Sequence, residues 1–265
     1  MIEFDQTYLL QLDAQRQSPN ARAKLGRYAD MLSPSPGHCV LDLGCGSGFF
    51  ARLLAEKVKP TGQVTGVDVA EDAVALAIGL SRSFPADLLM FRPADGQALP
   101  FEDETFDSVA CISVLEFCED PALVLYEAHR VLRPGGRLLV VNSDEDTRGY
   151  NGHDVELGRK MMRAIADRGR DPWLARRLAH LIVATGFHIR QEVVLAEPER
   201  EYGPESSGYI HARAWRDHLL ASGKVSHQEY KRWLADLEQC AREGAYFYGV
   251  TTCAYLVERS SMDED

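Results

Sequence analysis

Three aspartates and a glycine-rich segment are spaced so that they could hold a nucleoside-containing ligand. The segment from Asp42 follows a short apolar run and carries glycines at positions 44, 46 and 48. Glycine lets a backbone approach a ligand closely and adopt conformations that other residues resist. Asp68 ends a second apolar run, where a carboxylate can accept hydrogen bonds from both hydroxyls of a ribose. Asp95 follows a third run, so we expect one site built from three loops.

A glycine triplet after a strand is also typical of dinucleotide-binding enzymes. That pattern needs Gly or Ala at its sixth position, where this chain has the bulky Phe49. Two purely structural interpretations stay open beside the binding one. Asp42 could cap the following helix, and Asp95 could serve only to form a turn.

The segments that must position these residues alternate between apolar runs and helical patterns. Expected strands cover 39–43, 63–68, 88–93, 106–113, 137–142, 187–195 and 246–257, and expected helices cover 21–32, 49–58, 73–82, 121–132, 154–168, 172–185 and 226–242. This alternation is typical of a doubly wound α/β sheet with right-handed crossovers. We expect a single domain over 1–265. Its expected parts are a helical arm or lid at 1–36, a core at 37–196 and 245–258, and a helical insertion over the substrate pocket at 197–244.

Five segments, at 40–48, 64–68, 93–101, 106–109 and 131–138, resemble class I S-adenosylmethionine-dependent methyltransferases. The resemblance is to the ubiquinone/menaquinone C-methyltransferase-like branch, or methyltransferase type 11. It implies a Rossmann-like seven-stranded sheet of order 3-2-1-4-5-7-6 with an antiparallel last strand. It also implies S-adenosyl-L-methionine as cofactor, with Asp42 orienting its amine, Asp68 holding its ribose and Asp95 its adenine. The implied cofactor-binding residues are Asp42, Gly44, Cys45, Gly46, Gly48, Asp68, Val69, Asp95, Gly96, Ile112 and Ser113.

The resemblance further implies methyl transfer to a small-molecule acceptor by direct in-line displacement. A sulfonium methyl is already activated, so the protein mainly aligns the acceptor and excludes water, and needs a base only when the acceptor must lose a proton. Two alternatives stay open: a cofactor-dependent cyclase or decarboxylase, and a non-catalytic cofactor-binding partner subunit. The acceptor, the atom methylated and the oligomeric state, a homodimer included, stay open too.

Residues of the acceptor site are predicted from loops at the expected carboxyl edge of the sheet. Many relatives carry a histidine after the glutamate that corresponds to Glu116, whereas this chain has Phe117, which removes one base. Asp144 follows the fifth expected strand and is our candidate for a catalytic base or substrate contact. The predicted substrate-pocket residues are Tyr8, Glu116, Phe117, Tyr150, Tyr209 and Tyr246.

Composition excludes some classes of function. A net charge of −11 argues against nucleic-acid binding, which needs a basic face. The six cysteines include no Cys-x-x-Cys pair, so we predict neither a metal site nor a disulfide framework. We find no signal peptide and no apolar run long enough for a membrane span, and we expect a cytoplasmic protein.

Overall fold

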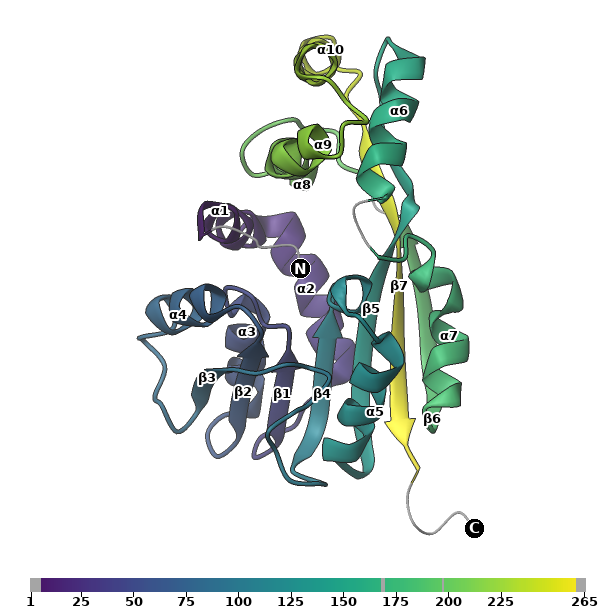
Figure 1. Cartoon of the computed structure of the whole chain (residues 1–265). Coiled ribbons are helices and arrows are strands. Elements are labelled where there is room, and N and C mark those ends of the chain that lie inside the picture. The colour runs from purple at the N-terminus through teal and green to yellow at the C-terminus, as the bar shows by residue number, and fades with distance from the viewer. Residues whose placement is uncertain (1–5, 168–169, 197, 261–265) are drawn as a thin grey trace. The chain divides into compact units, whose positions relative to one another are not determined.

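The computed structural model describes residues 6–167, 170–196 and 198–260, so the first five residues of the predicted arm and residue 197 of the predicted insertion lie outside it. Its sheet has seven strands in the order β3-β2-β1-β4-β5-β7-β6, which confirms the predicted order (Figure 1). Figure 1 shows β7 running opposite to β1, β2 and β4. The strands are β1 (Cys39–Leu43), β2 (Gln63–Asp68), β3 (Leu89–Pro93), β4 (Phe106–Ile112), β5 (Leu132–Tyr150), β6 (Phe187–Ala196) and β7 (Tyr248–Arg259).

The helices begin at the capping signals that the sequence carries. Ser18 caps α2 ahead of a proline, and Ser226 with Glu229 forms a complete capping box on α10. The helices are α1 (Gln6–Arg16), α2 (Pro19–Leu32), α3 (Phe49–Val58), α4 (Glu71–Leu80), the short 3-10 helix η1 (Leu115–Phe117), α5 (Pro121–Val131), α6 (Val155–Ala166), α7 (Leu174–Ala184), α8 (Ser207–Ala214), α9 (Arg216–Ala221) and α10 (His227–Arg242). None of the described helices is long and apolar enough to cross a membrane.

The chain divides into two compact units. The first unit comprises Met1–Asn142, Arg177–Val193 and Ala254–Asp265, and the second comprises Ser143–Arg176 and Val194–Cys253. The predicted cofactor-binding residues all belong to the first unit, whereas the predicted acceptor residues are shared between both units.

In the first unit, parallel pairing brings the carboxyl ends of four strands to one edge. Leu43 of β1 lies beside Val67 of β2 on one side and Cys111 of β4 on the other. Asp68 in turn lies beside Pro93 of β3. The loops after β1, β2, β3 and β4 therefore start side by side, at the edge where open α/β sheets bind ligands.

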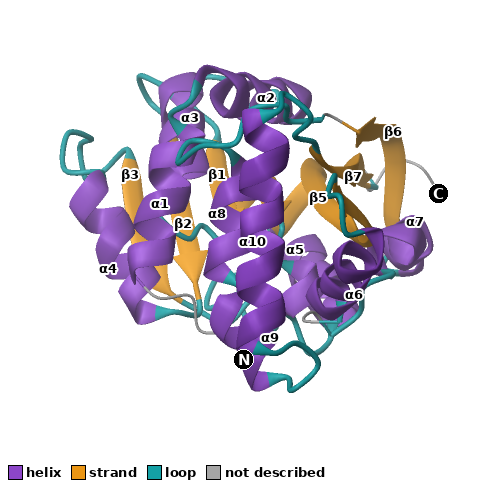
Figure 2. Ribbon diagram, turned by 90° about the horizontal axis from the view of Figure 1, so that it is seen from above, coloured by secondary structure: helices purple, strands orange, loops and turns teal. Residues whose placement is uncertain are grey.

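The second unit has a hydrophobic core of its own, supplied by α6, α8, α9 and α10. These four helices are labelled in Figure 2. Its buried members are Leu157, Met161, Ala164, Ile165, Ala212, Trp215, Leu219, Val225, Tyr230, Trp233 and Leu237. Trp173, Trp215 and Trp233, the three tryptophans of the chain, all belong to this unit, so intrinsic fluorescence reports on it selectively.

Three elements differ from the sequence expectation. β5 was expected to end at residue 142 but continues to Tyr150, because the charged side chains of its extension have ion-pair partners that the local pattern does not reveal. The segment at 197–209 was expected to be a loop, yet α8 begins within it at Ser207. The arm contains a further helix, α1, whose faces carry too little apolar contrast to be recognised as helical.

Candidate cofactor site and acceptor residues

The loop between β1 and α3 is shaped by glycines with positive φ. The φ angles are +73° at Gly44, +52° at Gly46 and +75° at Gly48. A Cβ on Gly44 would lie 2.2 Å from Cγ2 of Val114, whereas a Cβ on Gly46 would meet no atom within 4 Å. Gly44 is therefore needed for packing, and the backbone of Gly46 faces open space that a ligand can occupy.

Asp68 is fixed by backbone donors on both of its carboxylate oxygens. Oδ2 accepts from the amide of Gly46 at 2.9 Å, and Oδ1 accepts from the amide of Ala70 at 3.0 Å. Because a carboxylate has about four acceptor positions, each oxygen keeps capacity for another bond. The neighbouring Val69 is 51% exposed and presents apolar surface at the same strand end. This pairing of a fixed acceptor with an apolar contact fits a ribose and its base.

Asp42 is a buried acid with an incomplete set of hydrogen bonds. It is 3% exposed, and its Oδ2 has no hydrogen-bond partner within the described part of the chain. Burial raises the pKa of Asp42 from 3.8 to about 7, which Arg16 and a backbone hydrogen bond from Ala51 oppose and Asp68 reinforces. Because Ala51 lies in the first turn of α3, its hydrogen bond to Asp42 agrees in part with the interpretation that Asp42 caps this helix. Oδ2 of Asp42 can therefore accept a hydrogen bond from a cationic group of a ligand.

The helical arm adds polar contacts to the glycine loop that the sequence analysis did not predict. Asp13 of α1 accepts from Ser47 Oγ at 2.8 Å and from Arg52 Nη2 at 2.5 Å. Burial lowers the pKa of Arg16, while Tyr8 and Asp42 raise it, so a second, partly buried charge lies close to Asp42. The sequence signal that could have indicated these contacts is the spacing of Asp13 and Arg16, which are three residues apart and so share one face of a helix.

The loops after β3 and β4 complete this edge of the first unit. Asp95 is exposed and accepts from the amide of Gln97 at 2.9 Å, so it does form a turn. The adjacent Gly96 packs against Leu43, because a Cβ there would lie 3.1 Å from its Cδ2. Ile112 is partly buried at the end of β4. Ser113 follows with a φ of +57°, an unfavourable conformation for a residue with a side chain, and such strain gathers at binding sites.

The acceptor residues predicted in the first unit differ in how open they are. Glu116 is 5% exposed and accepts a short hydrogen bond from Nδ2 of Asn142, the last residue of the first unit's part of β5. Phe117 and Tyr8 are partly buried. Glu116 therefore also has a structural role, beside the pocket role that we predicted.

Asp144 lies in an ion-pair network of the second unit. Arg176 donates from Nε to Asp144 Oδ2 at 2.6 Å and from Nη2 to Oδ1 at 3.0 Å. The same Nη2 reaches Asp146 Oδ2 at 3.3 Å, and Trp173 donates to that oxygen at 3.1 Å. Since Arg176 engages both oxygens of Asp144, the arrangement favours a positioning role over a role as base.

A cavity of about 520 Å³ that is open to solvent lies in the second unit, and its lining residue Val155 is itself exposed. Its lining combines charged side chains with apolar ones: Asp146, Arg148, Tyr150, Asn151, Gly152, Asp154, Val155, Gly158, Arg159, Met162 and Arg163. Tyr150, which we predicted as a substrate-pocket residue, lines this cavity and donates to the carbonyl of Gly208 at 2.9 Å. Tyr209 and Tyr246 are not among the lining residues. The ring centre of Tyr209 lies 3.6 Å from Cζ of Arg213. Tyr246 is 1% exposed, and burial raises the pKa of its hydroxyl.

The wall of this cavity contains a buried ion pair. Arg148 donates to Glu145 from Nη2 at 2.5 Å and from Nε at 3.1 Å. It also makes a short hydrogen bond to the hydroxyl of Tyr248, and its guanidinium lies 4.8 Å from the ring centre of Trp215. Burial opposes the charge of Arg148, but Tyr248 and Glu145 outweigh burial and raise its pKa.

Comparison with known proteins identifies the first unit. Residues 41–140 match the family described as methyltransferase domain. An uncharacterized 37.1 kDa protein in transposon TN4556 of Streptomyces fradiae is 33% identical over 228 residues, which cover 79% of this chain and 66% of that protein. The demethylmenaquinone methyltransferase of Staphylococcus aureus is 34% identical over 111 residues, 42% of this chain and 45% of that enzyme. The chain thus spans about two thirds of one curated relative and less than half of the other.

Solved structures share the fold at lower identity. A SAM dependent methyltransferase from Aquifex aeolicus has a TM-score of 0.56 at 17% identity, covering 95% of this chain and 99% of that one. The [4+2]-cyclase SpnF has a TM-score of 0.58 at 22% identity, covering 91% of this chain and 81% of that one. The sheet order, the family match and these relatives agree with the glycine loop and its acids. The chain therefore contains a methyltransferase domain of the class I S-adenosylmethionine-dependent family.

Proposed function

We propose that this protein transfers a methyl group from S-adenosylmethionine to a small-molecule acceptor by direct in-line displacement. The observation that carries the proposal is the buried carboxylate of Asp42, whose Oδ2 has no hydrogen-bond partner among the described residues, in a loop where the backbone of Gly46 faces open space. When bound, S-adenosylmethionine supplies a methyl group already activated by its sulfonium. The chain then has to hold the donor, align the acceptor and keep water out.

The residues at the edge of the first unit fit the parts of this cofactor. Its amino-acid end carries an ammonium and a carboxylate, which match the charges of Asp42 and Arg16 respectively. Asp68, held by two backbone amides, would accept hydrogen bonds from the ribose hydroxyls. Val69 would contact the adenine, and Asp95 would accept from its amino group. Burial would strengthen the pairing of the cofactor's ammonium with Asp42 and of its carboxylate with Arg16, because the local dielectric is low.

Asp68→Ala is expected to weaken S-adenosylhomocysteine binding by about one to two orders of magnitude, since hydrogen bonds to a charged acceptor contribute about 1.5–3 kcal/mol each. Titration calorimetry measures the effect. Asp72→Ala is the matched control, because it removes an exposed acid from the first turn of α4. Equal affinities of the two variants would contradict the assignment of Asp68.

We further propose that the second unit recognises the acceptor. The family match ends at residue 140, before the second unit begins at Ser143, so this unit is free to differ in specificity. Its cavity combines Tyr150, Val155 and Met162 with charged groups. Such a lining suits an acceptor with an apolar body and a polar or anionic group.

Asp144→Asn is expected to lower kcat about ten-fold while changing the Kd for the cofactor less than about two-fold, because one weakened charged hydrogen bond costs about 1.4 kcal/mol. The variant loosens Arg176, which also holds Asp146 in the cavity wall. Steady-state kinetics and calorimetry separate the two effects. Equal losses in kcat and cofactor affinity would assign Asp144 a purely structural role.

Turnover itself distinguishes the proposal from its two alternatives. An acceptor library is incubated with the full chain and the cofactor, and products are scored for the mass gain of one methyl group together with S-adenosylhomocysteine. Release of methylthioadenosine instead would indicate a cyclase. Binding of the cofactor without turnover on any acceptor would support a non-catalytic subunit.

A further inference from the structure

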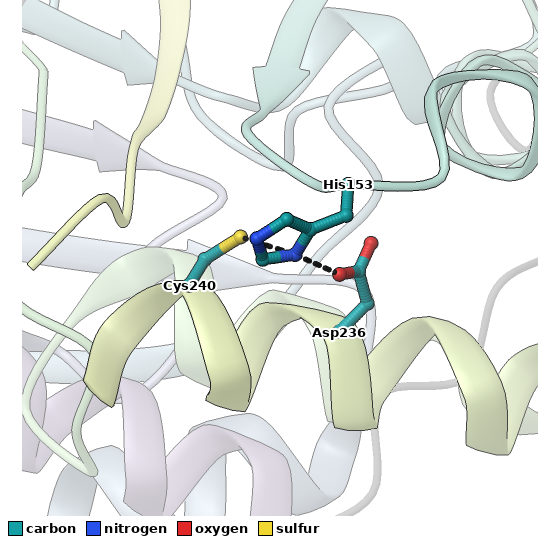
Figure 3. A group of neighbouring side chains, drawn as sticks. All are labelled: His153, Asp236 and Cys240. Carbon is teal, nitrogen blue, oxygen red and sulfur yellow. Dashed lines mark hydrogen bonds and ion pairs between the residues drawn. The ribbon is translucent and has the colours of Figure 1, made fainter. Parts of the chain in front are cut away.

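A histidine, an aspartate and a cysteine of the second unit point toward one another (Figure 3). His153 lies just before α6, whereas Asp236 and Cys240 lie one turn apart on the same face of α10. The ligand atoms of these three side chains all lie within 4.8 Å of one another. We propose that His153, Asp236 and Cys240 form a binding site for a zinc ion, a property independent of methyl transfer.

The distances between these atoms are close to those of a zinc site. His153 Nδ1 is 3.5 Å from Cys240 Sγ and 2.6 Å from Asp236 Oδ1. Zinc bonds of about 2.0–2.3 Å in a tetrahedral arrangement place neighbouring ligand atoms roughly 3.3–3.6 Å apart. The nitrogen–sulfur separation already has this value, and the aspartate oxygen needs to move by less than about 1 Å.

Hydrogen bonds from neighbouring groups hold His153 and Asp236 in place, as hydrogen bonds around a metal site hold its ligands. The second nitrogen of His153, Nε2, lies 2.9 Å from Glu243 Oε2, so it can donate to a carboxylate while Nδ1 faces the ion. The second oxygen of Asp236 accepts from the amide of Asp154 at 3.1 Å. A histidine that binds a metal usually donates its other N–H to such a carboxylate, which fixes the ring.

The backbone before His153 passes close to α10, which brings His153 near Asp236 and Cys240. A Cβ on Gly152 would lie 2.7 Å from Oδ2 of Asp236, so glycine permits the segment to pass close to α10. Asn151 holds the segment through its amide, 3.0 Å from the carbonyl of Phe247, and through its side chain, 2.9 Å from the carbonyl of Ala245. The position of His153 is thus largely set before any ion arrives.

The donor set selects the type of metal. Sulfur and imidazole ligands favour zinc over magnesium or calcium, which prefer oxygen. One thiolate and one carboxylate balance the double charge of the ion. Three protein ligands leave the fourth tetrahedral position to water. The cysteine spacing did not indicate this site, because the fold brings His153 to a helix whose Asp236 is 83 positions away.

Zinc binding by the full chain tests the proposal without any methyl acceptor. The protein is stripped with a chelator, titrated with zinc alone against a competing indicator, and titrated separately with cobalt. We expect about one zinc per chain, in keeping with a three-ligand site, and a sulfur-to-cobalt charge-transfer band in the near ultraviolet. Because zinc binds the folded state, it should also raise the unfolding midpoint.

Variants assign the binding to these side chains. Cys240→Ser and His153→Ala should each weaken zinc binding more than ten-fold, and Glu243→Gln should weaken it about ten-fold by removing support for the ring. Cys253→Ala and His227→Ala, which remove another thiol and another imidazole from the same unit, should bind as the parent does. His153→Ala keeps the test valid if Cys240→Ser fails to fold, because His153 has an exposed side chain.

Two results would overturn the proposal: a parent chain that retains no zinc against the indicator, or a His153→Ala variant with unchanged affinity. S-adenosylhomocysteine binding is measured on the same samples. Its failure would affect the proposed methyl transfer and leave the zinc assignment untouched.

Discussion

Asp42→Asn is expected to weaken S-adenosylmethionine binding by about a hundred-fold, as removal of a charged partner worth about 3 kcal/mol implies. The same variant should raise the free energy of unfolding of the cofactor-free protein at neutral to basic pH. Both effects have one cause. The carboxylate of Asp42 is buried, and its Oδ2 has no hydrogen-bond partner among the described residues, so its charge destabilises the cofactor-free fold and would be stabilised by a cationic ligand. Calorimetry and urea denaturation measure the two effects.

The direction of the pH dependence follows from the raised pKa. Burial moves the pKa of Asp42 from 3.8 to about 7, against the opposing effect of Arg16 and with a smaller increase from Asp68. Below about pH 4 the carboxyl is protonated in both folded and unfolded chains, so its burial costs nothing through ionisation. As the pH rises through 7 the folded state must carry the charge, and the cost grows to at most about 4 kcal/mol.

The parent chain should therefore lose stability relative to Asp42→Asn between about pH 4 and 7, and its cofactor affinity should fall as the pH is lowered below about 7. Asp72→Asn is the control for an exposed acid. Parallel pH profiles of parent and Asp42→Asn, in both binding and stability, would refute the role given to this carboxylate.

Arg148→Met should destabilise the second unit by about 3–5 kcal/mol, because it removes the cation that is paired with the buried carboxylate of Glu145. The side chains of Arg148 and Glu145 are each 4% exposed, so water cannot replace the lost cation. Tryptophan fluorescence during urea unfolding is the measurement, since the guanidinium lies against Trp215 and all three tryptophans belong to this unit.

Arg159→Met is the matched control for this prediction. Arg159 pairs with Glu156 at 3.0 Å, but these side chains are 75% and 84% exposed, so the loss should stay below about 1 kcal/mol. The double variant Arg148→Met with Glu145→Leu should recover most of the stability, because it removes both buried charges. A single Arg148→Met variant as stable as the control would show that the pair contributes nothing to the second unit.

Local patterns predicted the strands and helices that carry the proposed cofactor residues. Strand and helix signals around the glycines at 44, 46 and 48 depend on neighbouring residues, and the family resemblance supplied the strand order that the structure confirms. Asp42 and Asp68 lie at the carboxyl ends of β1 and β2, and Asp95 follows β3, so parallel pairing places all three at one edge of the sheet. Their contacts with a cofactor remain predictions.

Local patterns did not predict the surroundings of the proposed acceptor residues, because the partners of these residues are distant in sequence, and their role in acceptor binding stays a prediction. Asp144 was expected in an open loop, but β5 continues through it and Arg176 engages both of its oxygens. Tyr209 and Tyr246 do not line the second unit's cavity, and Tyr246 is almost fully buried, while their role in a substrate pocket stays a prediction. A tyrosine pattern does not show whether the ring faces a cavity or a core.

The amino-acid sequence by itself determined where the strands, the glycine loop and the acids at the strand ends lie along the chain, since each is encoded within a few neighbouring residues. The order of the strands in the sheet was predicted from the family resemblance. Only the tertiary structure decided that Arg16 lies near Asp42, that Arg148 is buried with Glu145, and that His153 meets Asp236 and Cys240. The free energy of a charge depends on burial and on partners brought together by folding, and neither is written in local spacing.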